Sequence, residues 1–239
     1  MAGSKKGRKK PTGKEVAVVV VSVIMVVSIL LPSFSQIFAS QPTTSSAPTS
    51  FDGAASQYQP EVDSAKEAVA RDGGDKAARL KLAQAYYRWG IYAESYAGND
   101  DEQSEAKELL DQAQQAFSAY LDLEGSLDSD DAKNAAVDRA LCEYYAGDTA
   151  ACIDSLKSVA DETNYAPAWA NLGMMYENQG STQDAMDAYQ HGIDADPDGT
   201  AGVKSYCEQM LSSLKGSAAS ESGGAQALSE KLDTTQSSS

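Results

Sequence analysis

Apolar residues recur at intervals of three and four over most of the chain after Pro60. Up to about Leu214 this spacing appears in eight segments, among them AARLKLAQAYYRW, AKELLDQAQQAFSAYLDL and QDAMDAYQHGI, and it places apolar side chains on one face of a helix. Clusters such as RDGGD and DADPDG separate the segments and are typical of helix caps and stops. Strand-like alternation is almost absent there. The pattern predicts an all-α domain over residues 58–215, made of eight helices in antiparallel hairpins.

One pair of predicted helices carries apolar and small residues at fixed intervals. The residues concerned are Trp169, Leu172, Gly173, Tyr176, Ala185, Tyr189 and Pro197. Their spacing resembles the tetratricopeptide repeat (TPR), a helix pair with the pattern W-x2-L-G-x2-Y, then A-x3-F, then P. In this repeat, over residues 166–199, we expect small side chains at Gly173 and Ala185 to let the helices approach closely. We expect Trp169, Leu172 and Tyr176 to fill the inner face.

The other helix pairs resemble the repeat less closely. In the first pair, about eighteen extra residues separate LKLAQAYYRWG from AQQAFSAYL, and we expect them to lengthen both helices and their loop. The middle pair, VDRALCEYYAGDTAACIDSLKSVA, has a shortened turn and no final Pro. Residues 62–70 resemble the second helix of a degenerate leading unit, and residues 202–214 a capping helix. The resemblance implies a right-handed superhelix of about three helix pairs.

In the TPR family the binding surface is the concave side lined by the first helix of each pair. The residues that the resemblance places there are Gln84, Tyr87, Arg88, Arg139, Cys142, Tyr145, Met174, Glu177 and Asn178. Tyr and Met suit adaptable binding surfaces, although tyrosines at this spacing also serve in packing. TPR domains that clamp a C-terminal carboxylate resemble one another in a Lys and two Asn. Here only Asn171 fits that pattern, so we do not expect such a clamp.

The distribution of charge divides the chain into a basic head and an acidic body. Residues 1–15 hold six Lys and Arg against one acid, Glu15. Removing these from the chain's 19 basic and 35 acidic residues leaves 13 and 34, a net charge of about −21 for the rest. Because nucleic-acid binding needs clustered Lys and Arg, we expect the body to bind neutral, cationic or apolar partners and no nucleic acid.

Between head and body lies a strongly apolar segment, residues 16–39. Its first sixteen residues, VAVVVVSVIMVVSILL, contain nothing more polar than Ser, and with the following residues a helix of this length reaches bilayer thickness. A cleaved secretory signal and a buried core helix are alternatives. The length, the cationic flank and the lack of an Ala-x-Ala site favour an uncleaved transmembrane signal-anchor. The positive-inside rule then places the head in the cytoplasm and the C-terminal domain outside.

Two further segments have the composition of disordered chain. Residues 40–57 are rich in Ser, Thr, Pro and Gly, and residues 216–239 have the same character. Such segments bury too little apolar surface to offset their ordering entropy. We expect a flexible linker and a disordered tail.

The sequence contains no arrangement of residues typical of catalysis, cofactor binding or metal binding. The single histidine, His191, has no Cys or carboxylate spaced around it as in known zinc motifs, and we expect it at the surface or groove edge. Phosphate-binding loops and nucleophile elbows are absent. Cys142 and Cys152 lie on opposite arms of one predicted hairpin and are either a disulfide or buried thiols; Cys207 is the third cysteine.

These features indicate a non-enzymatic, membrane-anchored interaction module that binds protein or peptide segments outside the cytoplasmic membrane. The arrangement resembles single-pass TPR proteins of bacterial envelopes, which implies a role in export or in assembly of envelope complexes. A structural spacer or self-assembling element without a peptide ligand is the alternative. An enzyme or a soluble secreted protein is a third possibility.

Overall fold

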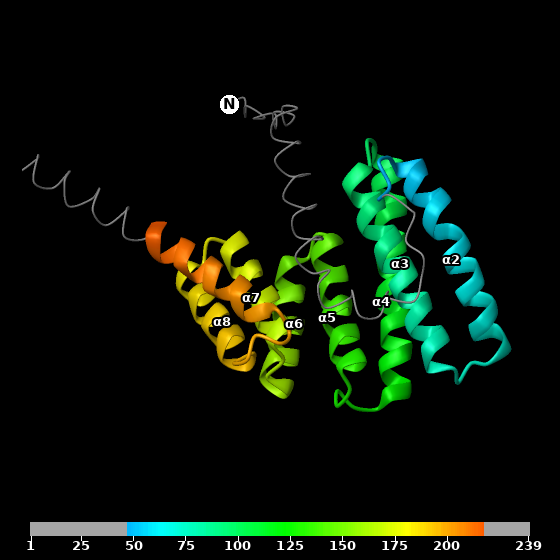
Figure 1. The fold of residues 1–239 in the computed structure, drawn as a ribbon. Coiled ribbons are helices and arrows are strands. Elements are labelled where there is room, and N and C mark those ends of the chain that lie inside the picture. The colour runs from blue at the N-terminus through cyan, green and yellow to red at the C-terminus, as the bar shows by residue number, and fades with distance from the viewer. Residues whose placement is uncertain (1–46, 218–239) are drawn as a thin grey trace, which may run out of the picture. The chain divides into compact units, whose positions relative to one another are not determined.

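The computed structural model describes residues 47–217, which are α-helical apart from the turns between helices (Figure 1). The predicted head, the apolar segment 16–39 and residues 218–239 of the predicted tail lie outside the described residues. Within the described part, no strand occurs, and none of the helices has the length and apolar character needed to cross a membrane. The prediction of an all-α domain is confirmed.

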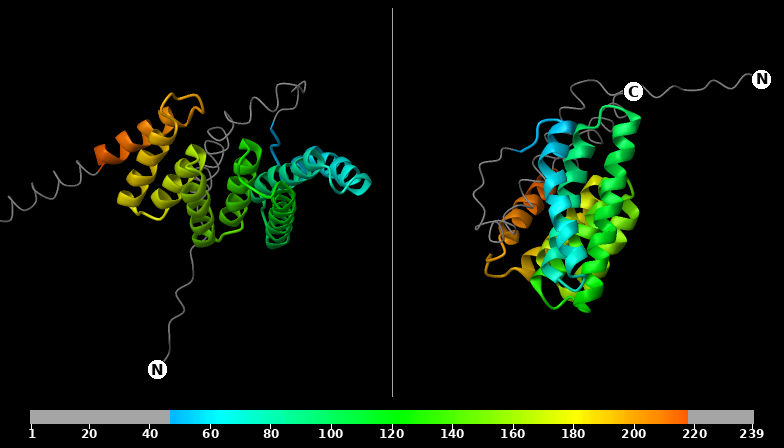
Figure 2. Two further views of the ribbon diagram at one scale, coloured as in Figure 1. Left: turned by 90° about the horizontal axis from the view of Figure 1, so that it is seen from below. Right: turned by 90° about the vertical axis from the view of Figure 1, so that its right-hand side faces the viewer.

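Within residues 47–217, seven helices follow one another, and residues 203–217 form an eighth helical stretch. The bounds are α2 Phe51–Arg71, α3 Lys76–Tyr96, α4 Asp100–Glu124, α5 Asp130–Tyr145, α6 Thr149–Thr163, α7 Ala166–Asn178 and α8 Thr182–Ala195. Each helix packs against the next, and α3 also packs against α5, and α5 against α7 (Figure 2). The first helices of the three pairs α3/α4, α5/α6 and α7/α8 therefore neighbour one another.

Helix α2 begins within the segment predicted to be a disordered linker. Its first residue is Phe51, and the Ser50 hydroxyl accepts a hydrogen bond from the Gly53 amide at 3.0 Å, which caps the helix. Ala54 and Tyr58 are buried against the neighbouring helix. The linker prediction is therefore wrong for residues 51–57. The Ser-rich composition and Pro60 inside the helix concealed an apolar stripe with a spacing of about four residues.

The insertion in the first pair lengthens its helices, as expected, but not their loop. Helix α3 has 21 residues and α4 has 25, and residues 97–99 alone connect them. The Asn99 side chain accepts hydrogen bonds from the Asp101 and Glu102 amides and starts α4 directly after α3. At Gly90, a Cβ atom would meet Leu110 Cδ2 at 2.8 Å, so the two long helices are in close contact. The extra residues extend the hairpin rather than its turn.

The clearest repeat packs largely as its motif predicts. A Cβ atom at Gly173 would lie 2.6 Å from the Tyr189 ring, and Ala185 is fully buried, which confirms the close approach of α7 and α8. Leu172 is buried on the inner face, but Trp169 and Tyr176 are only partly buried. The helical stretch 203–217 contributes buried Val203, Cys207 and Leu211 to the core of this repeat. It lies where the sequence predicted a capping helix.

Candidate protein-binding face

Helices α3, α5 and α7 together form the surface that we call the first-helix face. The structure places the predicted binding residues on it at different depths. Tyr87 and Tyr145 are buried with Cys142; Gln84, Arg88, Arg139, Met174 and Glu177 are partly exposed; and Asn178 is exposed. The rings of Tyr87 and Tyr145 meet edge to face with centroids 6.3 Å apart, and Tyr87 also contacts Phe117 of α4 at 5.9 Å. These two tyrosines join three helices, so they contribute to packing.

Two hydrogen bonds fix the register of α5 against α7. The Tyr165 hydroxyl donates to Asn134 Oδ1 at 2.8 Å, with a separation of 31 residues along the chain. Near the other end, Asn178 Nδ2 donates to the Tyr144 hydroxyl at 3.4 Å, with a separation of 34 residues. Both helices therefore run in the same direction. Along the helix axes, a residue in the middle of α5, such as Asp138, is therefore level with residues of α7 that come 31 to 34 positions later in the sequence.

Asp138 is a buried carboxyl group on this face. It is 6 % exposed, and within residues 47–217 no hydrogen bond reaches its carboxylate. Burial raises the pKa of Asp138 to about 8, and the positive charge of Arg88 only partly opposes this shift. The guanidinium of Arg88 hydrogen-bonds instead to Glu61 Oε2 at 2.7 Å. Asp138 is therefore largely protonated at neutral pH.

Asn171 of α7 is a second buried polar residue on this face, and it lies in the register range level with Asp138. It is 2 % exposed, and its Nδ2 donates to the Pro167 carbonyl at 2.8 Å. Its Oδ1 is buried and has no hydrogen-bond partner among the described residues. In the sequence, Asn171 was the one residue that fitted the carboxylate-clamp pattern, whereas Asp138 was not among the predicted binding residues. An acid within the small, apolar run AAVDRALC was the available signal.

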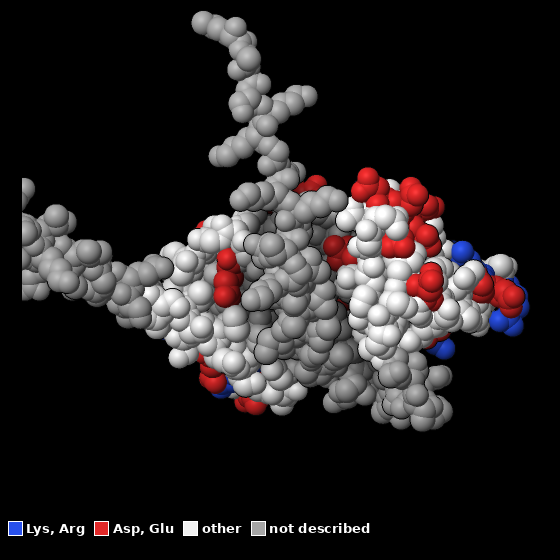
Figure 3. Space-filling view, turned by 90° about the horizontal axis from the view of Figure 1, so that it is seen from above, with Lys and Arg blue, Asp and Glu red and all other residues white. Residues whose placement is uncertain are grey.

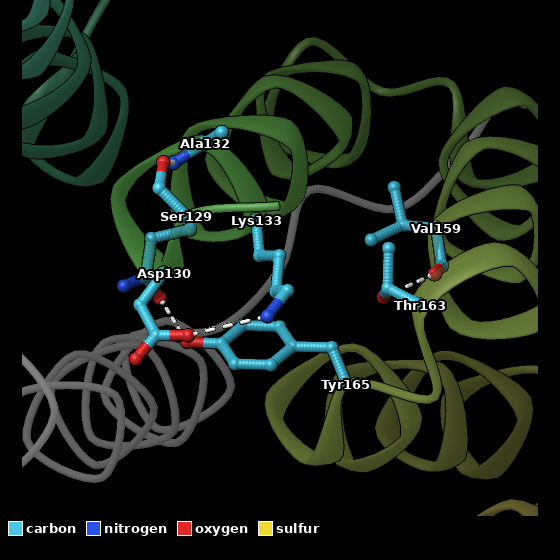
Figure 4. Close-up of polar contacts among 8 residues, drawn as sticks. Ser129, Asp130, Ala132, Lys133, Val159, Thr163 and Tyr165 are labelled. Atoms are coloured by element: carbon cyan, nitrogen blue, oxygen red, sulfur yellow. Dashed lines mark hydrogen bonds and ion pairs between the residues drawn. The ribbon is translucent and has the colours of Figure 1, made fainter. Parts of the chain in front are cut away.

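The N-terminal edge of the face carries an ion pair and an aromatic ring. Lys133 Nζ lies 3.3 Å from Asp130 Oδ1 and 5.7 Å from the centroid of the Tyr165 ring (Figure 4). Burial is the largest cause of a raised pKa at Tyr165, and nearby Asp130 and Asp138 add to it. Lys133 and Arg88 are thus already engaged by carboxylates.

Acidic side chains outnumber basic ones in the described part of the chain. Residues 47–217 contain 31 Asp and Glu against 12 Lys and Arg, a net charge of −19. The side of the described helices seen in Figure 3 shows many more acidic than basic side chains. This field attracts cations and repels phosphate backbones.

The residues with potential reactive chemistry occupy structural positions. His191 is exposed and stacks on Trp169 with ring centroids 4.5 Å apart. The three cysteines are free and buried, and burial raises the pKa of the Cys152 thiol to about 12. The possible bridge between Cys142 and Cys152 is therefore absent from the structure. Among the described residues, no group of three His, Cys, Asp or Glu side chains is placed to hold a metal ion.

Comparison with known proteins shows the fold but not a family. No family model matches the chain, and no curated protein matches it. Among solved structures, TTC0263, a TPR protein of Thermus thermophilus, matches with a TM-score of 0.52 and 14 % identity, over 84 % of this chain and 99 % of that protein. The described helices have a TPR-like fold. MamA matches with a TM-score of 0.43 and 17 % identity, over 70 % of this chain and 92 % of MamA.

Within a TPR-like fold, α3, α5 and α7 are the first helices of the repeats. The sequence resemblance named these helices as the ones that present the binding surface. Their side chains therefore include the candidate binding residues, together with Asp138 and Asn171. A fold by itself does not supply a function, so binding must depend on the chemistry of this face.

Proposed function

We propose that this chain is a non-enzymatic interaction module that binds a protein or peptide segment on its first-helix face. The observation that carries the proposal is Asn171 of α7, whose buried Oδ1 has no hydrogen-bond partner among the described residues, on one of the neighbouring first helices of a TPR-like stack. Buried polar groups are nearly always hydrogen-bonded, and those that are not require an explanation. A bound segment that donates a hydrogen bond to Asn171 Oδ1 is such an explanation.

We further propose that the module is anchored in the cytoplasmic membrane by residues 16–39, with its C-terminal domain on the outer side. The support is the sequence alone: sixteen nearly unbroken apolar residues follow six cations. In that position the module serves the export of envelope proteins or the assembly of envelope complexes. The acidic body suits partners that are cationic or neutral.

Cross-linking in membranes followed by purification of the chain tests the binding function. We expect a defined partner to be enriched over a control in which the first-helix face is blocked by Gln84→Trp and Asn178→Trp. Enrichment of nothing, or of the same proteins with the blocked variant, contradicts the proposal. If the chain is instead a self-assembling spacer, light scattering will show oligomers of the full chain and the only adducts will be between its own copies.

Membrane fractionation tests the anchor separately. We expect the chain to stay in the membrane pellet after high-salt and carbonate washing, and a protease added outside the membrane to digest the C-terminal domain. Release of the chain into the soluble fraction would contradict the anchor but would leave the binding function open to its own test.

A further inference from the structure

Three polar side chains lie where α5 and α7 end on the first-helix face. They are Tyr144 of α5 and the successive residues Glu177 and Asn178 of α7, and we call them the helix-end site. Asn178 Nδ2 donates a hydrogen bond to the Tyr144 hydroxyl at 3.4 Å, so the last turns of the two helices lie side by side. Asn178 is exposed, and Glu177 and Tyr144 are partly exposed. The site is therefore open to solvent.

Contacts with buried residues hold two of these side chains in place. The hydroxyl of Tyr189, a fully buried residue of α8, donates a hydrogen bond to Glu177 Oε2 at 3.0 Å. The Tyr144 ring packs edge to face on the ring of buried Tyr145, with centroids 5.3 Å apart. Because these side chains are already ordered, a ligand that binds them loses little affinity to side-chain entropy.

The helix-end site keeps two hydrogen-bond acceptors for a ligand. Within residues 47–217, no Lys or Arg forms an ion pair with Glu177, and no donor bonds to Glu177 Oε1 or Asn178 Oδ1. Both atoms accept hydrogen bonds and cannot donate them. The partly exposed Tyr144 ring lies beside them, and the faces of aromatic rings attract cations. A ligand for this site is therefore a cationic donor.

The position at helix C-termini makes the site more negative than Glu177 alone would. The last carbonyl groups of a helix carry a partial negative charge of about half an elementary charge. Helices often offset this charge with Lys or Arg in the last turn, but the last turns of α5 and α7 contain neither. Burial raises the pKa of Tyr144, and the charge of Glu94 on α3 adds to this shift. A second carboxylate thus acts on the site from the neighbouring first helix.

Resting on the proposed function, we infer that the helix-end site binds one Arg side chain of the partner segment. The guanidinium donates to Glu177 Oε1 and Asn178 Oδ1 and packs on the Tyr144 ring. Arg suits the site better than Lys, because its N–H groups form a rigid planar fork that reaches two acceptors at once and stacks on aromatic rings. A Lys ammonium binds as a point charge without this fork. The partner therefore presents an arginine to the ends of α5 and α7.

Binding of fluorescein-labelled hexaarginine and hexalysine to the full chain tests this inference. Anisotropy in a nonionic detergent at about 0.15 M salt gives both affinities. The two peptides carry the same charge, so general attraction to an acidic surface affects them alike. We expect the natural chain to bind hexaarginine about fivefold more tightly than hexalysine. Asn178→Ala removes one of the two acceptors and should reduce this ratio to less than about twofold.

A second set of variants tests the charge and the ring. Glu177→Gln removes the charge and keeps the shape of the side chain, and we expect it to weaken hexaarginine binding about fivefold. Tyr144→Leu removes the ring and should weaken binding about threefold. The matched control is Glu162→Gln, because Glu162 is an exposed acid in the last turn of α6, which also lacks a basic residue there. This control should change the affinity less than about twofold.

Equal affinities of the natural chain for the two peptides would overturn the inference. Unchanged hexaarginine binding by Glu177→Gln, or an equal loss in Glu162→Gln, would also overturn it. If a chain lacking residues 1–15 binds hexaarginine more tightly than the full chain, its own basic head occupies the site and the assignment to a partner is wrong. In each case, partner adducts in membranes that the blocked variant loses would still support the proposed function. Absence of those adducts as well would contradict both proposals.

Discussion

Replacing Asp138 by Asn should stabilise the protein at neutral pH and remove part of its pH dependence. Burial raises the pKa of Asp138 from 3.8 to about 8. Between these two values the folded state holds a proton that the unfolded state has released, so the free energy of unfolding falls as pH rises. Above pH 8 both states are ionised and this contribution levels off.

The size of this change in unfolding free energy follows from the difference between the pKa values of Asp138 in the unfolded and folded states. At pH 7, protonating a carboxyl with a pKa of 3.8 costs about 4 kcal/mol, at roughly 1.36 kcal/mol per pH unit. Asn resembles the protonated acid in shape and does not ionise, so it avoids this cost. Its amide adds N–H donors that lack a partner, which costs about 1 kcal/mol. We therefore expect Asp138→Asn to gain roughly 3 kcal/mol at pH 7.

Urea unfolding of the full chain in mild detergent, followed by circular dichroism at pH 4.5, 6 and 7.5, measures this difference. Glu94 also has a pKa raised by burial, but it is present in both proteins and its effect cancels. The gain should be small at pH 4.5 and largest at pH 7.5. Parallel pH profiles would refute the reasoning, as would a variant less stable at pH 7.5, because either result would mean that Asp138 is ionised and paired in the folded protein.

Three further predictions concern packing, capping and the thiols. Gly173→Ala should cost about 1–3 kcal/mol of unfolding free energy, because its Cβ atom would meet the Tyr189 ring at 2.6 Å, whereas Gly98→Ala, with 3.5 Å to its nearest neighbour, should cost little. Ser50→Ala should cost about 1 kcal/mol and speed amide exchange in the first turns of α2. Thiol titration should show slow labelling of the native chain and three reactive thiols after denaturation. A single reactive thiol after denaturation would indicate a disulfide.

The parts of the fold that could be predicted are those that repeat a local rule. The spacing of apolar residues was sufficient to find the helices, and the match at Gly173 and Ala185 was sufficient to predict the close contact of α7 and α8. The start of α2 was missed because its apolar stripe of Ala54 and Tyr58 lies among Ser and Gly. Composition predicts disorder there, while the Ser50 cap and packing against α3 favour a helix.

The site was harder to predict because it depends on contacts between repeats. An acid on an amphipathic helix usually faces solvent, and the sequence alone does not reveal that Asp138 lies beneath neighbouring side chains. Its position level with Asn171 follows from the bonds from Tyr165 to Asn134 and from Asn178 to Tyr144, each spanning more than thirty residues. No local pattern encodes such a register.

Site-specific photo-cross-linking in intact membranes tests most directly whether the first-helix face is the binding surface. A photoreactive residue would replace Gln84 or Asn178 on this face, and Asp154 or Asp187 on the second helices as matched controls. The account predicts adducts with one partner from the first two positions and none from the other two. Adducts from the second helices alone, equal adducts from all four positions, or none from Gln84 and Asn178 would contradict it.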